Sequence, residues 1–324
     1  MTAVLSIPRM PAAALTPVGA EALRGLTATP KHLAPWLFYD QRGSELFEAI
    51  TALPEYYVTR TEREIFSRSA EEILEACGGP LAILELGAGT AAKTGLILDA
   101  ARRRQDSVTY YPIDISPSAL DAAQRHLSEN LPDIEIQPRV ADYTREMDSL
   151  PGAGSRRLVL YIGSSIGNFD PKDATELLRK LRRQLAPGDL LLLGLDHVKD
   201  RGTLQRAYND SARVTAEFNR NILTRLNREL GACFRPTLFR HRARWNDRES
   251  RIEMHLESLI AQRVEIVALD MTVGFRRGET IHTENSYKFT AESATALMTR
   301  SGFEPMRLWT DPRRWFGVYL ARAA

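Results

Sequence analysis

The sequence predicts an α/β protein in which helices cover both faces of a mainly parallel, doubly wound sheet. Short apolar runs alternate with helical segments from residue 81 to residue 196, and this alternation is typical of right-handed strand–helix–strand units. The central runs are apolar throughout, as expected of strands buried on both faces. The expected strands are 81–86, 108–113, 134–140, 157–162 and 189–195, and the expected helices are 61–77, 91–104, 118–130 and 172–185.

The pattern changes after residue 196. Residues 203–230 predict one or two helices, whereas residues 251–268 and 279–289 alternate between apolar and polar side chains, as half-buried antiparallel strands do. The chain then returns to its first pattern. The remaining expected elements are a helix at 293–301 and a strand pair at 303–309 and 316–321.

These patterns divide the chain into two expected domains. Residues 61–196 plus 288–324 would form a nucleotide-binding domain, and residues 1–60 plus 197–287 would form a second, α+β domain that binds the substrate. Residues 1–30 are rich in Ala, Pro and Thr, and we expect them to be extended.

Composition and charge argue against several classes of partner. The 324-residue chain has a formal net charge of +2, too small to indicate nucleic acid or an anionic membrane. It has no apolar run of membrane-spanning length and no signal-peptide pattern at its N-terminus. Cys77 and Cys233 are far apart, and the six histidines show no metal-ligand spacing. We therefore expect a cytoplasmic protein that binds no metal.

Glycine and acidic residues follow the first three expected strands, at the sheet edge where ligands of such folds bind. Gly87 and Gly89 end the first strand, and they let the backbone turn tightly and approach a ligand closely. Asp114 ends the second strand, 25 residues after Gly89, where a carboxylate can accept hydrogen bonds from ribose hydroxyls. Asp142 and Tyr143 end the third strand, placed for an adenine amino group and ring face.

The third glycine of the dinucleotide fingerprint is absent, because position 92 is alanine. A pyrophosphate needs the close helix approach that this glycine allows, so the sequence argues against NAD or FAD. The C-terminal strand pair also resembles the seven-stranded, Rossmann-like sheet of class I methyltransferases, whose last strand is antiparallel. That resemblance implies S-adenosyl-L-methionine as cofactor and S-adenosyl-L-homocysteine as its product.

Unusual residue combinations carry a more specific resemblance, which covers nearly the whole chain. They lie at residues 38–47, 53–60, 163–168, 207–210, 218–221, 244–246, 251–254, 283–289 and 309–311. With them the sequence resembles the histidine Nα-methyltransferase family, which makes hercynine (Nα,Nα,Nα-trimethyl-L-histidine) in the first step of ergothioneine biosynthesis. The expected partners are L-histidine and its mono- and dimethyl forms, bound by a monomer.

The resemblance implies roles for individual residues. Those expected to contact S-adenosylmethionine are Gly87, Lys93, Asp114, Asp142 and Tyr143. Those expected to hold the amino and carboxylate end of the substrate are Tyr56, Asn168 and Tyr208, with Tyr39 and Phe47 lining the pocket near the amine. Asn168 and Tyr39 are the candidate catalytic residues.

The same resemblance assigns the imidazole to the stretch Glu284-Asn285-Ser286. Glu284 and Ser286 would read the ring, and both face one side of an expected strand because they lie two residues apart. A carboxylate and a hydroxyl can pair with the two imidazole nitrogens. Asn285 replaces the apolar residue of the family pattern, and its side chain should point away. Met254, on a neighbouring strand candidate, has a flexible thioether that can cap the pocket.

Each of these residues also has a structural interpretation. Glu284 and Ser286 can belong to a solvated strand face, and Met254 to plain core. Asn168, which follows glycine, can simply form a turn. Tyr39, Phe47, Tyr56 and Tyr57 can pack an N-terminal segment instead of forming an aromatic wall for a quaternary ammonium, and Tyr208 can be a core or rim residue of a helix.

Three other functions remain open on the sequence alone. The first is Nα-methylation of another amino acid, such as tryptophan or a prenylated tryptophan, against which Glu284 and Ser286 argue. The second is methylation of RNA or protein, which the near-neutral charge disfavours. The third is a catalytically silent nucleotide-binding or interaction module.

Overall fold

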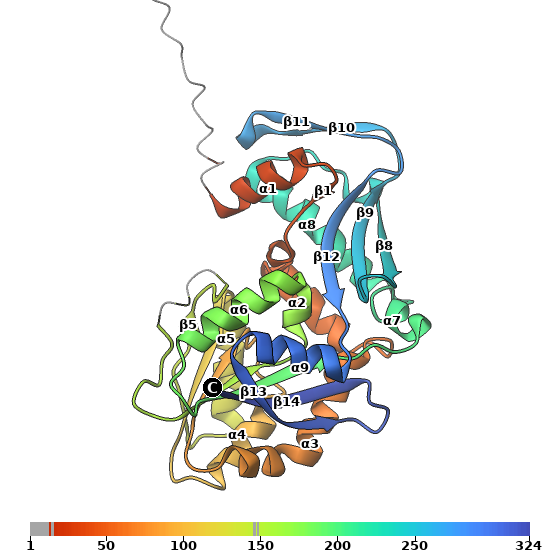
Figure 1. The fold of residues 1–324 in the computed structure, drawn as a ribbon. Helices are drawn as coiled ribbons and strands as arrows, with labels where there is room; N and C mark the ends of the chain where they lie inside the picture. The colour runs from red at the N-terminus through yellow and green to blue at the C-terminus, as the bar shows by residue number, and fades with distance from the viewer. Residues whose placement is uncertain (1–12, 14–15, 145–146, 148) are drawn as a thin grey trace, which may run out of the picture. The chain divides into compact units, whose positions relative to one another are not determined.

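The computed structural model describes residues 13, 16–144, 147 and 149–324 (Figure 1). The described chain forms two compact units. Unit 1 contains the residues up to Ile50 together with Tyr208–Arg244 and Glu253–Glu284, and unit 2 contains Thr51–Ala207, Trp245–Ile252 and Asn285–Ala324.

Unit 2 contains the predicted sheet. Its strands lie in the order β4 (Ile134–Ile136), β3 (Val108–Asp114), β2 (Ala82–Leu86), β6 (Arg157–Tyr161), β7 (Leu190–Asp196), β14 (Phe316–Ala323) and β13 (Phe303–Thr310), and the short β5 (Arg139–Val140) also pairs with β3. Strands β4 to β7 are parallel, whereas β14 runs antiparallel between β7 and β13. The predicted parallel sheet with an antiparallel last strand is confirmed.

Helices enclose this sheet on both faces, as its apolar strands require. They are α3 (Tyr57–Cys77), α4 (Gly95–Arg102), α5 (Pro117–Asn130), α6 (Pro171–Arg183) and α9 (Ala291–Arg300). Unit 2 also contains α7 (Arg201–Ala207), which follows β7. Figure 1 shows the sheet between α3 and α4 on one side and α6 and α9 on the other. Every residue of β6 and β7 is buried, and each fully buried leucine contributes about 1.5–3 kcal/mol relative to its exposed state.

Unit 1 combines helices with two small sheets. It contains α1 (Pro17–Thr27), β1 (Lys31–His32), α2 (Gln41–Thr51), α8 (Val214–Leu230), β8 (Phe239–Asn246), β9 (Arg251–Ser258), β10 (Gln262–Ile266), β11 (Met271–Phe275) and β12 (Thr280–Tyr287). One sheet has the order β1-β12-β9-β8, in which β1 pairs parallel with β12, and β10 pairs antiparallel with β11 in a second, two-stranded sheet. The alternation expected for residues 251–258 is confirmed, because every second residue of β9 is buried.

Residues 17–27 form a helix, so the expectation of an extended N-terminal segment was wrong there. The Thr16 hydroxyl accepts the Gly19 N–H at 3.1 Å, which caps the helix. Pro17 occupies the first helical position, where its fixed φ is favourable and its missing N–H costs nothing. The expectation for residues 1–12, 14 and 15 lies outside the described residues.

The unit boundaries differ from the domain boundaries expected from the sequence. Residues 51–60 lie in unit 2, because α3 begins at Tyr57 and packs against β7, β13 and β14. Residues 197–207 also lie in unit 2, and residues 245–252 and 285–287 join it where strands β8, β9 and β12 cross the boundary. The third expected strand, 134–140, is two short strands, because Pro138 between them has no N–H to donate.

No helix in the described part of the chain is both long and apolar enough to cross a membrane.

Candidate functional site

The loop after β2 depends on backbone conformations that favour glycine. Gly87 has φ +72° and Gly89 has φ +52°, in the left-handed region. A Cβ on Gly87 would lie 3.3 Å from the hydroxyl oxygen of Tyr143. Gly87 therefore lets the Tyr143 ring, which follows β5, come close to the loop after β2. The loop and the ring bring together two of the expected cofactor-binding residues.

Asp114 links the end of β3 to the same loop. One of its carboxylate oxygens accepts the Gly89 N–H at 2.9 Å, and the other accepts the Ser116 N–H at 2.9 Å. Burial raises the pKa of Asp114, and the backbone hydrogen bonds act in the opposite direction. Asp142 lies after the next strand, where it accepts the N–H and hydroxyl of Thr144. Two carboxylates therefore stand at the carboxyl ends of neighbouring strands.

Lys93, the remaining expected cofactor ligand, forms an ion pair with Glu62 of α3. The Glu62 side chain is fully buried, whereas that of Lys93 is 20% exposed. Glu62 also accepts the N–H of Gly163, which lies two residues after the end of β6. The sequence interpretation did not identify Glu62, because its partners lie 31 and 101 residues away.

Asn168 lies at the end of the loop that follows β6. The turn Ser165–Asn168 is entered through Ser164, which has φ +59°. A Cβ on Gly167 would lie 2.9 Å from the carbonyl oxygen of Tyr287, so this glycine allows the loop to approach the end of β12 closely. In unit 2 the Asn168 loop is therefore adjacent to the stretch that contains Ser286.

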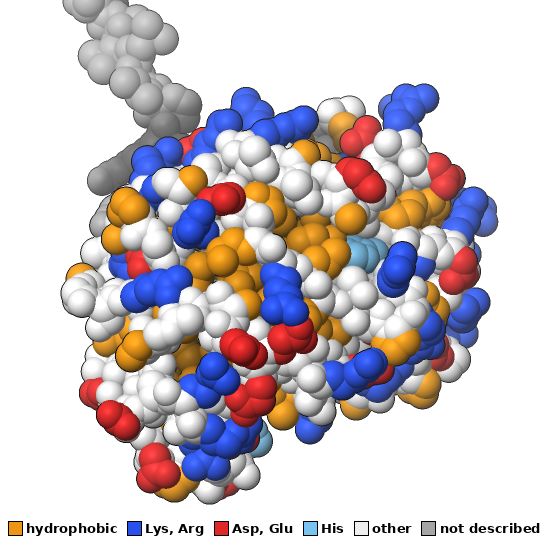
Figure 2. All heavy atoms as spheres, turned by 60° about the horizontal axis from the view of Figure 1, so that its bottom comes forward, with side chains coloured by type: hydrophobic (Ala, Val, Ile, Leu, Met, Phe, Trp, Pro, Cys, Tyr) orange, Lys and Arg blue, Asp and Glu red, His pale blue; other side chains and the backbone are white. Residues whose placement is uncertain are grey.

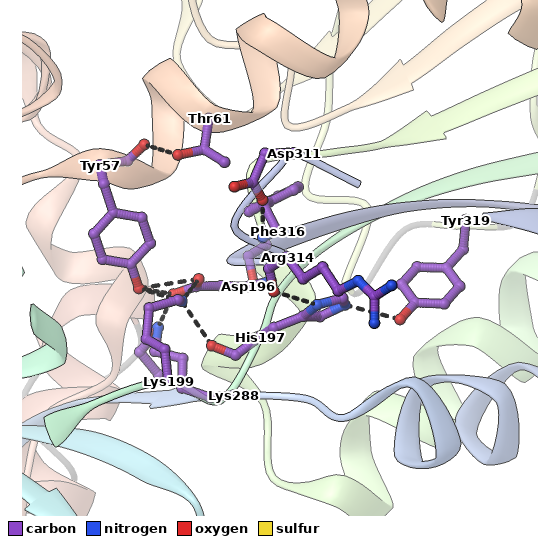
Figure 3. Close-up of polar contacts among 12 residues, drawn as sticks. Tyr57, Thr61, Asp196, His197, Lys199, Lys288, Asp311, Arg314, Phe316 and Tyr319 are labelled. Carbon is purple, nitrogen blue, oxygen red and sulfur yellow. Dashed lines mark hydrogen bonds and ion pairs between the residues drawn. The ribbon is translucent and has the colours of Figure 1, made fainter. Parts of the chain in front are cut away.

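A buried network of charged side chains lies where β7 ends (Figure 3). The Tyr57 hydroxyl donates to Asp196 at 2.7 Å, and the Lys288 ammonium lies 2.9 Å from the same carboxylate. Lys199 also pairs with Asp196, and burial lowers the pKa of Lys199 to about 8. Lys288 donates to the Ser286 hydroxyl at 2.8 Å, so the network reaches one of the expected substrate ligands.

The other residues expected near the imidazole, Glu284, Asn285 and Met254, have different surroundings. Asn285 donates to Asp170, just before α6, at 3.2 Å. Ser286 is buried, whereas Glu284 in unit 1 is half-buried. Met254 of β9 is 1% exposed, and its carbonyl oxygen accepts the Thr283 hydroxyl at 3.1 Å.

The aromatic residues expected near the amine form a cluster in unit 1. The ring centroids of Tyr39 and Phe47 are 5.9 Å apart, and Phe218 of α8 lies 6.0 Å from Tyr39. Tyr208 is buried in the same unit, as the first residue of its segment Tyr208–Arg244. Its carbonyl oxygen lies 2.8 Å from His241 Nε2. Tyr56 belongs to unit 2, where it immediately precedes α3.

The carboxylates that end two strands of unit 2 suit the hydroxyl and amino groups of a nucleoside better than a phosphate. Carboxylates at the ends of β3 and β5 accept hydroxyl and amino groups, and they would repel a pyrophosphate. Among the described residues no group of three or more His, Cys, Asp or Glu side chains is placed to hold a metal ion. On the face that Figure 2 draws, acidic and basic side chains are interspersed.

Comparison with known proteins decides the family. The model of the family described as "Histidine-specific methyltransferase, SAM-dependent" matches residues 18–323. The chain belongs to this family. It is therefore an S-adenosylmethionine-dependent methyltransferase, and the expected fold and family are confirmed.

Two relatives of this methyltransferase are named histidine N-alpha-methyltransferase, and a third is named for ergothioneine biosynthesis. It is 46% identical to the histidine N-alpha-methyltransferase of Mycolicibacterium smegmatis, over 93% of this chain and 95% of that enzyme. It is 44% identical to the enzyme of the same name from Mycobacterium tuberculosis, over 92% of each chain. It is 29% identical to ergothioneine biosynthesis protein 1 of Neurospora crassa, over 90% of this chain and 33% of that protein.

Glu85 gives the methyltransferase a testable dependence of stability on pH. It accepts hydroxyl hydrogen bonds from Thr94 and Tyr110, and burial raises its pKa from 4.5 to about 7. The Glu85 carboxyl group therefore binds its proton more tightly in the folded protein than in the unfolded chain. Its contribution to stability is complete below the unfolded pKa and is lost as the pH rises through about 7.

We expect Glu85→Gln to remove this contribution. Between about pH 5 and about pH 8, the free energy of unfolding of the parent protein should fall by about 2 kcal/mol more than that of the variant. Denaturant unfolding at several pH values measures the difference. The exposed control Glu129→Gln should follow the parent, and parallel pH profiles for Glu85→Gln and the parent would contradict the assignment.

Proposed function

We propose that this methyltransferase transfers three methyl groups to the α-amino nitrogen of L-histidine and so makes hercynine, the first step of ergothioneine biosynthesis. The observation that supports this most is the 46% and 44% identity to two histidine N-alpha-methyltransferases over more than nine-tenths of the chain. Glu284 and Ser286, two residues apart on β12, add chemistry suited to an imidazole.

Unit 2 would hold the methyl donor. Asp114 would accept hydrogen bonds from the ribose hydroxyls, Asp142 and Tyr143 would contact the adenine, and Gly87 and Lys93 would contact the remainder. When bound, S-adenosylmethionine supplies a methyl group that its sulfonium already activates. The protein therefore needs to position the acceptor nitrogen and to exclude water, without a nucleophile of its own.

The acceptor must lose a proton before each transfer. Tyr56, Asn168 and Tyr208 would hold the amino and carboxylate end of histidine, and Asn168 can do so without adding a charge. A pocket lined by Tyr39 and Phe47 would desolvate the amine and lower its pKa, which favours the reactive neutral form. The same ring faces attract the permanent cation that the third transfer creates.

Mass spectrometry of the purified protein with S-adenosylmethionine and a panel of amino acids tests this function. We expect histidine to gain three methyl groups on its α-nitrogen, and the mono- and dimethyl forms to be accepted as substrates. Methylation of an imidazole nitrogen, or a reaction that ends after one methyl group, would contradict the proposal. The panel includes tryptophan, so it also tests the alternative that another amino acid is the substrate.

Asn168→Ala should separate substrate positioning from cofactor binding. We expect histidine turnover to fall by about tenfold or more, since one charge-assisted hydrogen bond is worth about 1.5–3 kcal/mol. Affinity for S-adenosylhomocysteine should stay within about threefold of the parent, because a separate group of residues holds the cofactor. Steady-state kinetics and calorimetry measure the two effects.

The control for this variant is Asn130→Ala, since Asn130 is an exposed residue at the end of α5 in the same unit. It should change neither quantity. An equal loss of turnover and cofactor affinity in Asn168→Ala would mean that the loop after β6 has only a structural role.

A further inference from the structure

Glu62 is a buried carboxylate that connects the loops after β2 and β6 in unit 2. It lies in the second turn of α3 and is 0% exposed. The N–H of Gly163, which follows β6, donates to both of its carboxylate oxygens at 2.9 and 3.1 Å. Its second oxygen also pairs with the ammonium of Lys93, in the loop that follows β2.

Two glycines lie next to this arrangement. A Cβ on Gly194 of β7 would lie 2.1 Å from a carboxylate oxygen of Glu62, so any side chain there would force Glu62 to move from its present position. A Cβ on Gly163 would lie 3.4 Å from the Lys93 ammonium, and this residue also has φ +76°. The glycine in β7 thus leaves the space that the Glu62 carboxylate occupies, and Gly163 gives the loop after β6 a backbone conformation that favours glycine.

The two partners of Glu62 belong to different parts of the proposed site. Lys93 belongs to the proposed cofactor loop after β2, and its side chain is 20% exposed. Gly163 begins the loop that ends at Asn168, the residue proposed to orient the amino acid. One carboxylate therefore holds a cofactor-side cation and an acceptor-side backbone N–H in a fixed relation. Methyl transfer requires this relation, because both reactants must be placed accurately.

We propose that Glu62 is a positioning residue for methyl transfer. It fixes the direction of the Lys93 ammonium and the position of Gly163, where the loop that contains Asn168 begins. The inference rests on the proposed function for the roles of Lys93 and Asn168. Glu62 itself is fully buried and acts through these two neighbours. Replacing its carboxylate should therefore disturb both cofactor affinity and turnover.

Glu62→Gln tests the proposal with little change in volume. Glutamine keeps one oxygen for the Gly163 N–H, but its NH2 group is a donor facing the Lys93 ammonium. We expect affinity for S-adenosylhomocysteine to fall about tenfold, as for one lost charge-assisted hydrogen bond, and kcat for histidine to fall at saturating cofactor. Calorimetry and steady-state kinetics on the purified full-length chain give the two values.

Asp189→Asn is the matched control. Asp189 is also a buried carboxylate, it pairs with Arg157, and it accepts two backbone N–H groups, at the opposite end of β6 and β7. We expect this variant to lower the melting temperature and to leave affinity and kcat unchanged. If Glu62→Gln likewise lowers only the melting temperature, the positioning role is wrong and Glu62 is structural.

A double-mutant cycle with Lys93→Met shows whether Glu62 acts through the lysine. Once Lys93 is methionine, adding Glu62→Gln should weaken S-adenosylhomocysteine binding by no more than about twofold further. The double variant should also melt above Lys93→Met, in which Glu62 is a buried charge without its cation. Additive losses of affinity would overturn the proposed route. If the parent methylates no amino acid, the proposed function fails, but this cycle needs no acceptor and still decides the role of Glu62.

Discussion

Replacing Asp114 with alanine is expected to weaken binding of S-adenosylmethionine and S-adenosylhomocysteine by at least about tenfold. A hydrogen bond to a charged acceptor is worth about 1.5–3 kcal/mol, and 1.4 kcal/mol is a factor of ten in affinity. Asp114 ends β3 next to the glycine loop, where ligands of parallel sheets bind. Isothermal titration with S-adenosylhomocysteine measures the dissociation constant directly.

Asp114 also organises the loop, because it accepts the N–H groups of Gly89 and Ser116. The variant Asp114→Asn separates the two roles, since asparagine retains an acceptor oxygen but loses the charge. Its affinity should lie between those of the parent and Asp114→Ala. The exposed control Asp133→Ala should bind as the parent does. An unchanged dissociation constant in Asp114→Ala would place the ribose elsewhere.

The sequence predicted those features that repeat or that follow directly from a strand. The leucine-rich β7 and the glycine turn after β2 are local patterns, and strand order then places Asp114 and Asp142 at one edge of the sheet. The same rule would have selected Asp196 at the end of β7, which the sequence interpretation left unused. Any acidic residue that ends a parallel strand should therefore be counted among the candidate site residues.

Other features depend on contacts that no local pattern reveals. In the sequence Glu62 is one of many charged residues in a predicted helix. It is fully buried because α3 packs against β7, β13 and β14. Lys288 likewise pairs with Asp196 because the chain that follows β12 lies beside the end of β7, where the Phe289 N–H donates to the Asp196 carbonyl oxygen. The α1 helix was missed for a different reason, since its Ala- and Pro-rich composition concealed a capped helix start at Thr16.

The substrate assignment can be tested by changing the preferred ring. Glu284 of β12 is half-buried, and Met254 lies on the neighbouring strand β9 in the same unit. A carboxylate paired with an imidazole contributes about 1.5–3 kcal/mol, so Glu284→Ala should lower histidine affinity by roughly 10- to 150-fold. The same carboxylate penalises apolar rings, because such a ring would leave it unpaired.

Glu284→Ala combined with Met254→Val should therefore admit a larger, apolar ring such as indole. The first change removes the penalty for an unpaired carboxylate, and the second shortens a flexible side chain that is 1% exposed. Competition between histidine and tryptophan at limiting enzyme, followed by mass spectrometry, measures the ratio of kcat/KM values. Glu257→Ala is the control, since Glu257 is a carboxylate of β9 that pairs with Arg240 and Arg242. It should retain the parent preference. If the double variant also keeps the preference of the parent for histidine, Glu284 and Met254 do not read the ring, and other residues set the specificity.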